Sequence, residues 1–212
     1  MIKFRVNLHS DSRRRLFRAK PIYECTKRFL DFVFALLLLV ILFGPMLLIA
    51  VAVRVESGSP VLYRQERLGR FGRPFMMIKF RTMVPSAERD GPVWTVKNDP
   101  RRTRTGIFLR RFHLDELPQL WNILRGDMSF VGPRPERSFF YEKFRTGIPE
   151  FEKRLLVRPG LTGYAQVNGG YELTPENKFD YDMEYIRRRS LLFDAYCVMR
   201  TVPTVLFGRG AR

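Results

Sequence analysis

The longest apolar stretch of the chain lies near its N-terminus. Residues 32–53 (FVFALLLLVILFGPMLLIAVAV) are 22 consecutive residues without a charged side chain. As a helix this run would be about 33 Å long, enough to cross the roughly 30 Å of hydrocarbon in a bilayer. No small-residue cleavage site follows it and the basic leader is long, so a signal peptide is disfavoured.

Two features argue against a simple membrane span. Gly44-Pro45 lies in the middle of the run, and a proline there removes a backbone hydrogen bond and clashes with the carbonyl of Ile41. Both flanks are also basic: residues 1–28 hold nine Lys/Arg against two acids, and residues 54–81 hold seven against two. Since Lys and Arg favour the cytoplasmic side of a membrane, both flanks are expected on that side.

A re-entrant helix pair satisfies both observations. The run would enter the cytoplasmic leaflet, bend at Gly44-Pro45 and leave on the same side. Its arms, 32–43 and 46–53, would be roughly 18 and 12 Å long, each too short to cross the hydrocarbon. A kinked single-pass anchor is the alternative, because transmembrane helices tolerate proline. Upstream, residues 21–31 predict an interfacial helix with a basic face.

After Val53 the pattern becomes that of a basic domain containing both strands and helices. Residues 62–65 and 75–80 are strand candidates, and the glycine-rich segment 69–74 between them predicts a turn. We therefore expect a β-hairpin. The polar, proline-containing residues 83–103 predict a loop.

Helical periodicity is strongest over residues 114–124. Asp115 is a suitable N-cap, Pro118 is tolerated in a first turn, and Gly126 is a suitable residue just past the end. One face of this helix would carry Leu114, Leu117, Leu120, Trp121 and Leu124.

The remaining pattern predicts further helices joined by turn-rich segments. We expect a proline-rich loop at 126–136, a helix over 137–155 interrupted at Gly147 and Pro149, a short strand at 164–167, and helices at 175–189 and 191–207. The predicted fold class is thus α+β: a mostly helical, small cytoplasmic domain with a β-hairpin and short strands, anchored by the re-entrant helix. The predicted organisation is a basic leader (1–20), the membrane helices (21–55), a basic cytoplasmic domain (56–207) and a tail (208–212).

The composition narrows the class of partner. The chain has 212 residues with 38 Lys+Arg against 21 Asp+Glu, a formal charge of +17. A hydrophobic share of 45% excludes an acidic disordered chain, and the charge predicts nucleic acid, an anionic membrane surface or a phosphorylated substrate as partner. The two cysteines, Cys25 and Cys197, can form neither a disulfide framework nor a four-ligand zinc site, and they favour a reducing compartment.

Asp115 and Glu116 are the first candidate for chemistry. They follow three potential cations, Arg110, Arg111 and His113, and open the predicted helix, whose N-terminus favours negative charge. An ionised aspartate in a cationic pocket can attack phosphorus, and an adjacent glutamate can hold Mg²⁺. A capped helix with two surface acids explains the same spacing.

Two basic motifs are candidates for phosphate binding. Arg134 lies between two prolines in GPRPE (132–136), on a stiff loop that suits a bidentate grip on a phosphate. Lys79 and Arg81 alternate with Phe80, which places both on one face of a strand. A solvated arginine on a rigid linker and a solvated strand face are the alternatives.

Asp180-Tyr181-Asp182 matches the D-x-D metal motif of many nucleotide-sugar glycosyltransferases. It lies in a predicted helix beside Arg187 and Arg188, where acids form ordinary surface pairs, so we discount it as a metal site. Neither a P-loop nor a dinucleotide-binding glycine motif, a zinc-protease motif or a nucleophile elbow occurs in the sequence.

Three blocks in order resemble one protein family. LDELPQLWNILRGDMSFVGPRPE (114–136) is similar to the signature of the bacterial sugar transferases, the monotopic phosphoglycosyl transferases. MIKFRTM (77–83) and RPGLTGYAQVNG (158–169) are similar to two further family blocks, and the resemblance covers about residues 20–207. Larger relatives carry transmembrane helices before this unit, so the chain is expected to be the minimal catalytic form.

The resemblance implies an activity and roles for several residues. Family members move a sugar 1-phosphate from a UDP-sugar to a polyprenol phosphate, usually undecaprenyl phosphate, by ping-pong catalysis with release of UMP. Asp115 would form the covalent phosphosugar intermediate and Glu116 would bind Mg²⁺, together with Asp115. The implied phosphate, sugar or base contacts are Arg134, Arg110, Lys79, Arg81, Gln166 and Asn168.

Some points stay open at this stage. The family often has serine before the helix-breaking proline, where this chain has Gly44. UDP-glucose, UDP-galactose and UDP-N-acetylated amino sugars all stay open as donors, and a homodimer stays open as the oligomeric state.

The expected location is the cytoplasmic face of the bacterial inner membrane. A membrane-anchored nucleic-acid-binding protein would explain the charge but neither Asp115-Glu116 nor GPRPE, so nucleic acid is not expected as a partner; a non-catalytic membrane scaffold is the third alternative.

Overall fold

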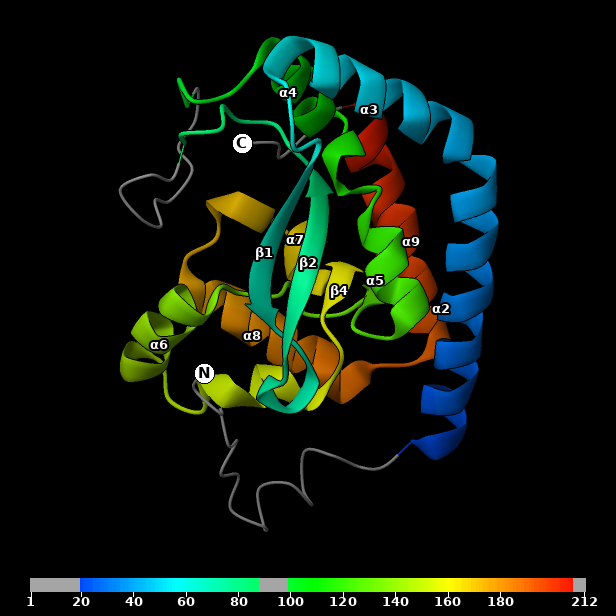
Figure 1. Cartoon of the computed structure of the whole chain (residues 1–212). Helices are drawn as coiled ribbons and strands as arrows, with labels where there is room; N and C mark the ends of the chain where they lie inside the picture. The colour runs from blue at the N-terminus through cyan, green and yellow to red at the C-terminus, as the bar shows by residue number, and fades with distance from the viewer. Residues whose placement is uncertain (1–19, 88–98, 208–212) are drawn as a thin grey trace.

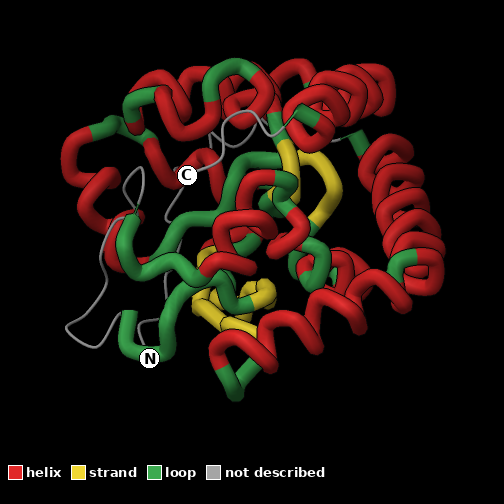
Figure 2. The backbone as a smooth tube through the Cα atoms, turned by 90° about the horizontal axis from the view of Figure 1, so that it is seen from above, coloured by secondary structure: helices red, strands yellow, loops and turns green. Residues whose placement is uncertain are grey.

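The computed structural model describes residues 20–87 and 99–207, so predictions for the leader, the tail and part of the 83–103 loop lie outside the described residues. A long bent pair of helices, α2 (Pro21–Ile41) and α3 (Phe43–Ser57), runs along one side of the molecule (Figure 1). The hairpin of β1 (Leu62–Leu68) and β2 (Pro74–Phe80) lies beside it. The remaining helices surround the short strands (Figure 2), and the predicted α+β class is confirmed.

The bend between the two N-terminal helices measures 63° and falls at Leu42. The expected break at Gly44-Pro45 is therefore displaced toward the N-terminus. The physical reason is that Pro45 is the third residue of α3, where its missing N–H costs no helical hydrogen bond. The ring instead prevents the preceding helix from continuing past Ile41. The predicted interfacial helix 21–31 is the first half of α2 and has no break from the apolar part.

No described helix by itself is long and apolar enough to cross a membrane, whereas α2 and α3 together meet that test as a bent pair. Their inner faces pack on the domain: Ala35 joins a buried cluster with Met77 and Ile123, and Val53 joins one with Phe80 and Leu109. Their outer faces leave large apolar side chains exposed: Phe29, Phe32, Val40, Ile41, Phe43, Leu47, Leu48, Val51 and Val55.

The predicted hairpin is confirmed. β1 and β2 pair antiparallel with Tyr63 opposite Lys79 and Gln65 opposite Met77. The turn contains a 3-10 segment, η1 (Arg70–Gly72). Every second side chain of β1, counted from Tyr63, therefore points to the same face of the hairpin as Lys79. This face lines the candidate site described below.

A second, parallel pair of strands escaped prediction. β3 (Ser129–Val131) pairs with β4 (Gly160–Thr162). The strand expected at 164–167 is wrong: these residues form the short helix α7 (Tyr164–Val167), and the strand lies just before them. Three-residue strands show no periodicity of their own, because the partner strand specifies them.

The helix expected over 114–124 is also wrong in its first half. Leu114–Glu116 form a 3-10 segment, η2, and the α-helix α5 covers only Gln119–Arg125. His113, immediately before η2, has a left-handed backbone (φ 55°), and Pro118 cannot donate a helical hydrogen bond. Asp115 is therefore not an N-cap.

Other helices match the predictions. The interrupted helix over 137–155 corresponds to α6 and a 3-10 segment, η3, and the two C-terminal helices are α8 and α9. The bounds are α4 (Arg104–Arg111), α6 (Ser138–Gly147), η3 (Phe151–Leu156), η4 (Gly170–Glu172), α8 (Pro175–Arg188) and α9 (Leu191–Leu206).

The D-x-D segment is not a surface pair throughout. Asp182 is 1% exposed, and its Oδ2 accepts a 2.7 Å bond from Nε of buried Arg154. Since Arg154 comes from η3, this ion pair joins η3 to α8. One of the two acids of the D-x-D segment is therefore committed to an ion pair inside the protein, and its exclusion as a metal site stays a prediction.

Candidate active site

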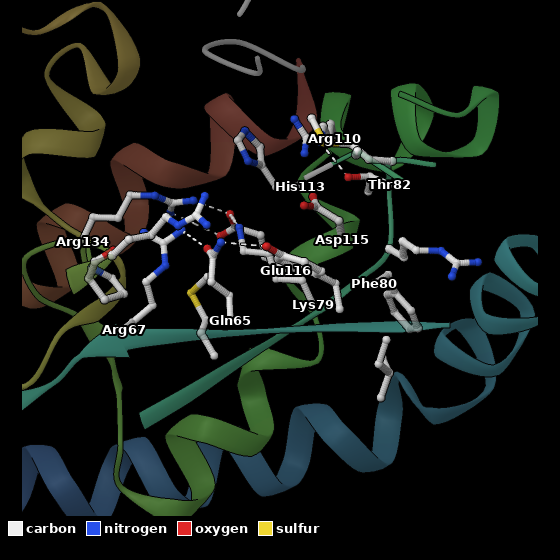
Figure 3. Close-up of a pocket in the computed structure, with 18 of the residues that line it drawn as sticks. Gln65, Arg67, Lys79, Phe80, Thr82, Arg110, His113, Asp115, Glu116 and Arg134 are labelled. Atoms are coloured by element: carbon white, nitrogen blue, oxygen red, sulfur yellow. Dashed lines mark hydrogen bonds and ion pairs between the residues drawn. The ribbon is translucent and has the colours of Figure 1, made fainter. Parts of the chain in front are cut away.

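A pocket of about 350 Å³ lies between the β-hairpin, η2 and the loop that follows β3 (Figure 3). It brings together residues from four separate segments of the chain. Of the predicted site residues, the pocket is lined by Lys79, Arg81, Arg110, Asp115, Glu116 and Arg134. The sequence blocks 77–83 and 114–136 therefore meet here.

Glu116 is the centre of a charge network. Its Oε1 accepts bonds of 2.6 Å from Nζ of Lys79 and 2.6 Å from Nη2 of Arg134, and Nη1 of Arg134 lies 3.5 Å from Oε2. Burial disfavours the charged carboxylate, but Arg134 and Lys79 outweigh it and hold the pKa of Glu116 well below the ordinary value. Glu116 therefore stays ionised and fixes two cations at the pocket wall.

Asp115 has a different environment. Its side chain is buried, with the residue 6% exposed, yet it accepts no hydrogen bond and forms no ion pair among the described residues. Burial raises the pKa of Asp115, Lys79 opposes the rise, and the charge of Glu116 adds to it. The sequence predicts that the N-terminus of an α-helix stabilises the charge of Asp115. In the structure Asp115 lies in the 3-10 segment η2 and not at the start of an α-helix. Its oxygens are poorly solvated and not engaged by protein donors, which suits a nucleophile.

The alternative interpretation, in which both carboxyls are surface acids on a capped helix, is excluded because both are buried. Asp115 and Glu116 are adjacent in a 3-10 turn, yet Glu116 alone contacts Lys79 and Arg134. The turn thus separates one carboxylate that organises cations from one that is left without donors.

The loop carrying Arg134 is held by the third sequence block. The backbone N–H of Gly132 donates to the carbonyl of Thr162 at 2.9 Å, and that of Gly160 donates to the carbonyl of Pro133 at 2.9 Å. A Cβ on Gly132 would lie 2.4 Å from the carbonyl oxygen of Arg158, so only glycine allows this approach. Block 158–169 therefore holds the loop that carries Arg134, the candidate for phosphate binding.

Gln166 and Asn168, the predicted sugar or base contacts, do not line this pocket. Nε2 of Gln166 lies 3.4 Å from the carbonyl of Leu161, and Nδ2 of Asn168 donates to the carbonyl of Tyr164 at 2.8 Å. The first bond reaches back to β4 and the second to the start of α7, so both stay within the same short stretch of chain. Their contact with a substrate stays a prediction.

The other two basic candidates line the pocket and also bond to the protein. Nε of Arg110 donates to Oγ1 of Thr82 at 2.8 Å. Nη2 of Arg81 donates to the carbonyls of Ser57 and Gly58, both at 2.7 Å, at the end of α3. Arg81 thus ties the N-terminal helix pair to the pocket wall.

Sequence reasoning missed the contribution of β1. Gln65 and Arg67 line the pocket, with Arg67 donating to the carbonyl of Pro135 at 3.0 Å and Gln65 donating to the hydroxyl of Tyr63 at 2.7 Å. These three side chains alternate along the strand, so the period of two could have identified them once β1 was extended beyond residue 65. His113 also lines the pocket.

The donor set fits one kind of metal ion. Mg²⁺ is commonly held by one or two carboxylates and completed by substrate phosphate oxygens and water. Asp115 has no protein donor on its carboxylate, and Glu116 is next to it in the same wall. Among the described residues no group of three or more His, Cys, Asp or Glu side chains is arranged to hold a metal ion, so two adjacent carboxylates here suit Mg²⁺ completed by a phosphate, not a closed all-protein site.

The acid sensitivity of folding should depend on Glu116. Because its folded pKa lies below its ordinary value of 4.5, its stabilising contribution is present above pH 4.5 and lost as the pH falls below it. Asp115, with a raised pKa, has the opposite sign: its contribution is present at low pH and lost as the pH rises. We expect the unfolding temperature in detergent to fall less steeply between about pH 5 and 3 in Glu116→Gln than in the unmodified protein. Exposed Glu142→Gln is the matched control and should follow the unmodified curve.

Comparison with known proteins adds to this geometry. The family model described as bacterial sugar transferase matches residues 22–208. The chain belongs to the bacterial sugar transferase family. The matched region contains all three sequence blocks and every residue that lines the pocket.

Several curated relatives of this bacterial sugar transferase are similar over most of its length. The UDP-N-acetylgalactosamine-undecaprenyl-phosphate N-acetylgalactosaminephosphotransferase of Aeromonas hydrophila is 41% identical over 91% of the chain and 46% of the relative. The UDP-glucose:undecaprenyl-phosphate glucose-1-phosphate transferase of Caulobacter vibrioides is 46% identical over 86% of the chain and 70% of the relative. That of Escherichia coli (strain K12) is 42% identical over 83% and 39%. The chain thus spans less than half of two of these relatives.

Proposed function

We propose that this protein transfers a sugar 1-phosphate from a UDP-sugar to undecaprenyl phosphate, as the first membrane step in assembling a surface glycan. The observation that carries the proposal is the paired environment of Asp115 and Glu116: one buried carboxylate without donors beside one that fixes two cations. Relatives that are named for this activity also support the proposal. Both substrates are phosphate anions, which accounts for the basic pocket.

In the first half of the proposed reaction, Asp115 is the nucleophile. A carboxylate oxygen forms a bond to the sugar-bearing phosphorus, the bond from that phosphorus to the bridging oxygen breaks, and UMP leaves with the electron pair. Lys79 and Arg134, held by Glu116, neutralise the phosphate oxygens so that a carboxylate can approach. Arg110 also lines the pocket and is a further candidate for the same role.

In the second half, the acceptor reverses the displacement. A phosphate oxygen of undecaprenyl phosphate attacks the same phosphorus, and the bond to Asp115 breaks. The products are the polyprenyl-diphosphate sugar and a regenerated carboxylate. The same cations serve both half-reactions because both are displacements at the same phosphorus atom.

We include Mg²⁺ as the cofactor, held by Glu116 and Asp115. When bound it would supply positive charge to the phosphate oxygens of the substrate. The residues themselves orient the phosphate: Arg134 through its planar guanidinium and Lys79 as a point charge.

We also propose that α2 and α3 form a re-entrant pair in the cytoplasmic leaflet of the inner membrane. The bend at Leu42, the exposed apolar outer faces and the basic flanks support this arrangement over a single kinked span. Arg81, which lines the pocket and caps α3, would then keep the site near the height of a lipid phosphate.

The test of the reaction is a single-turnover experiment on the purified protein in detergent. With Mg²⁺ and a panel of UDP-sugars but without acceptor, we expect a burst of UMP no larger than the enzyme present. Intact-mass analysis should show one added phosphosugar with the matching donor. Steady UMP release should then require undecaprenyl phosphate. UMP release that requires the acceptor from the first turnover, with no mass change, would exclude the covalent intermediate.

The re-entrant arrangement predicts the side on which two thiols react. Native Cys25 is exposed at the start of α2, and Ser59→Cys places a thiol just after α3. In sealed inner-membrane vesicles, a membrane-impermeant maleimide should label both positions from the same side. Labelling from opposite sides would instead establish a single-pass anchor. Buried Cys197 serves as the unreactive internal reference.

A further inference from the structure

A second concave surface lies apart from the catalytic pocket, where the first turns of α2 meet η1 and the loop before β4. This basic groove has a volume of about 510 Å³ and is lined by Glu24, Cys25, Arg28, Phe29, Phe32, Arg70 and Arg158. None of these residues lines the catalytic pocket. Three arginines stand against one glutamate, so the groove carries excess positive charge.

The arginines are fixed in place by backbone carbonyls. Arg28 donates to the carbonyls of Ile123 and Leu124 at 2.6 and 2.8 Å, and Nε of Arg158 donates to that of Gly126 at 3.1 Å. Together they cover the C-terminal end of α5. In the described part of the chain the terminal nitrogens of Arg158 donate to no protein group.

Arg70 completes the cationic wall. Its Nε donates to the carbonyl of Leu156 at 3.2 Å, and its Nη1 lies 3.8 Å from Glu24. Burial lowers the pKa of Arg70, Glu24 opposes the change, and the like charges of Arg158 and Arg189 lower it further. Glu24 is shared with Arg189 at 3.3 Å, so it does not neutralise the groove.

The other wall of the groove is aromatic. Phe29 and Phe32 are 65% and 44% exposed, and they lie on α2 where its apolar run begins. A guanidinium cluster beside exposed aromatic rings suits a ligand with a phosphate at one end and a hydrocarbon chain at the other. Free inorganic phosphate would use only the arginines.

We propose that this basic groove binds the phosphate of an anionic phospholipid headgroup, with Arg158 as the principal donor and an acyl chain against Phe29 and Phe32. The site is distinct from that of the undecaprenyl phosphate acceptor. The inference rests on the proposed placement of α2 in the membrane. A bound headgroup would fix the depth and tilt of α2 where it leaves the bilayer.

Cys25 provides the readout because it lines the groove and is exposed, while Cys197, the second cysteine in the sequence, is buried. The rate of alkylation of Cys25 is measured in nanodiscs of phosphatidylcholine alone and in nanodiscs that also contain the anionic lipid phosphatidylglycerol. We expect alkylation about tenfold slower with phosphatidylglycerol, as for a site filled at ten times its Kd. A third arm adds inorganic phosphate to protein in detergent, where we expect little protection.

Variants separate the groove from general membrane charge. Arg158→Gln should lose the protection by phosphatidylglycerol, whereas Arg158→Lys should keep part of it as a point charge. Arg145→Gln, an exposed arginine on α6 far from α2 in Figure 1, removes the same charge and should keep full protection. UMP release is measured on the same samples, so loss of protection with activity retained is distinguishable from failure of the proposed function.

Three results would overturn the proposal. One is equal alkylation rates in the two lipid mixtures; another is equal loss of protection in Arg145→Gln and Arg158→Gln, which would indicate a diffuse charge effect. Protection by inorganic phosphate equal to that by phosphatidylglycerol would assign the groove to a soluble phosphate and not to a lipid. Because Arg158 also bonds to Gly126, circular dichroism and the unfolding temperature of each variant establish that the fold is kept.

Discussion

Replacing Asp115 with asparagine is expected to lower the rate of UMP release about 10⁴-fold or more, as for loss of a covalent nucleophile. Asparagine has nearly the same shape, so the buried position stays filled. Its amide nitrogen and oxygen cannot attack phosphorus at a useful rate. The burst of UMP and the added phosphosugar mass should both disappear.

The control for this substitution is Asp180→Asn. Asp180 is exposed on α8 and belongs to the discounted D-x-D segment. It should retain the activity of the unmodified protein within about twofold, as is usual for surface substitutions. Residual activity of Asp115→Asn within tenfold of the unmodified protein would remove Asp115 from the nucleophile role. A large loss in Asp180→Asn would reinstate the D-x-D segment as a candidate site.

Substitution at Asp115 is also informative about stability. Since burial raises the pKa of Asp115, ionising this side chain costs more free energy in the folded protein than in the unfolded chain. Asp115→Asn should therefore leave the unfolding temperature unchanged or raise it, even as activity is lost. This opposition between stability and activity is typical of functional carboxylates.

Elements with long periodic patterns were predictable from the sequence, and short ones were not. The β-hairpin and the two C-terminal helices carry enough alternating or helical positions to identify them. β3 and β4 have three residues each and exist because they pair with one another across about thirty residues of sequence. A short segment of sequence therefore does not show which distant strand it will pair with.

The candidate site shows the same division. Charge and spacing made Asp115, Glu116 and Lys79 candidates, the family resemblance implied their roles, and the structure places all three in one pocket. Their separate environments could not be predicted, because the left-handed His113 replaces a helix N-terminus by a 3-10 turn. The support of the Arg134 loop by Gly160 is a backbone contact, which side-chain patterns do not record.

The buried ion pair of Arg154 and Asp182 illustrates a further limit. In sequence Asp182 is one acid among several on a polar helix, and nothing there indicates burial. In the structure its partner comes from η3, and Nη2 of Arg154 also donates to the carbonyl of Arg134 at 3.1 Å. The pair thus supports the same loop that block 158–169 holds from the other side.

Replacing Glu116 with glutamine is expected to lower kcat about 10²–10³-fold, the range seen when a preorganised charge is removed from an active site. Both Lys79 and Arg134 contact the same oxygen at 2.6 Å, so the neutral amide leaves two cations close together without a counter-charge. They should move apart and lose the geometry that binds the phosphate. Exposed Glu142→Gln, which loses only a surface pair with Arg145, should keep its kcat.

A double-substitution cycle tests whether Glu116 acts through these cations. Lys79→Met and Glu116→Gln should each reduce kcat, and the double variant should be little worse than Glu116→Gln alone, because residues that act as a unit are not additive. Additive losses would mean that the carboxylate and the ammonium act independently. Binding of Mn²⁺ in the presence of UDP, followed by electron paramagnetic resonance, separates the remaining role: Glu116→Gln should weaken it and Lys79→Met should not. If neither variant changes Mn²⁺ binding, Glu116 organises the cations and holds no metal.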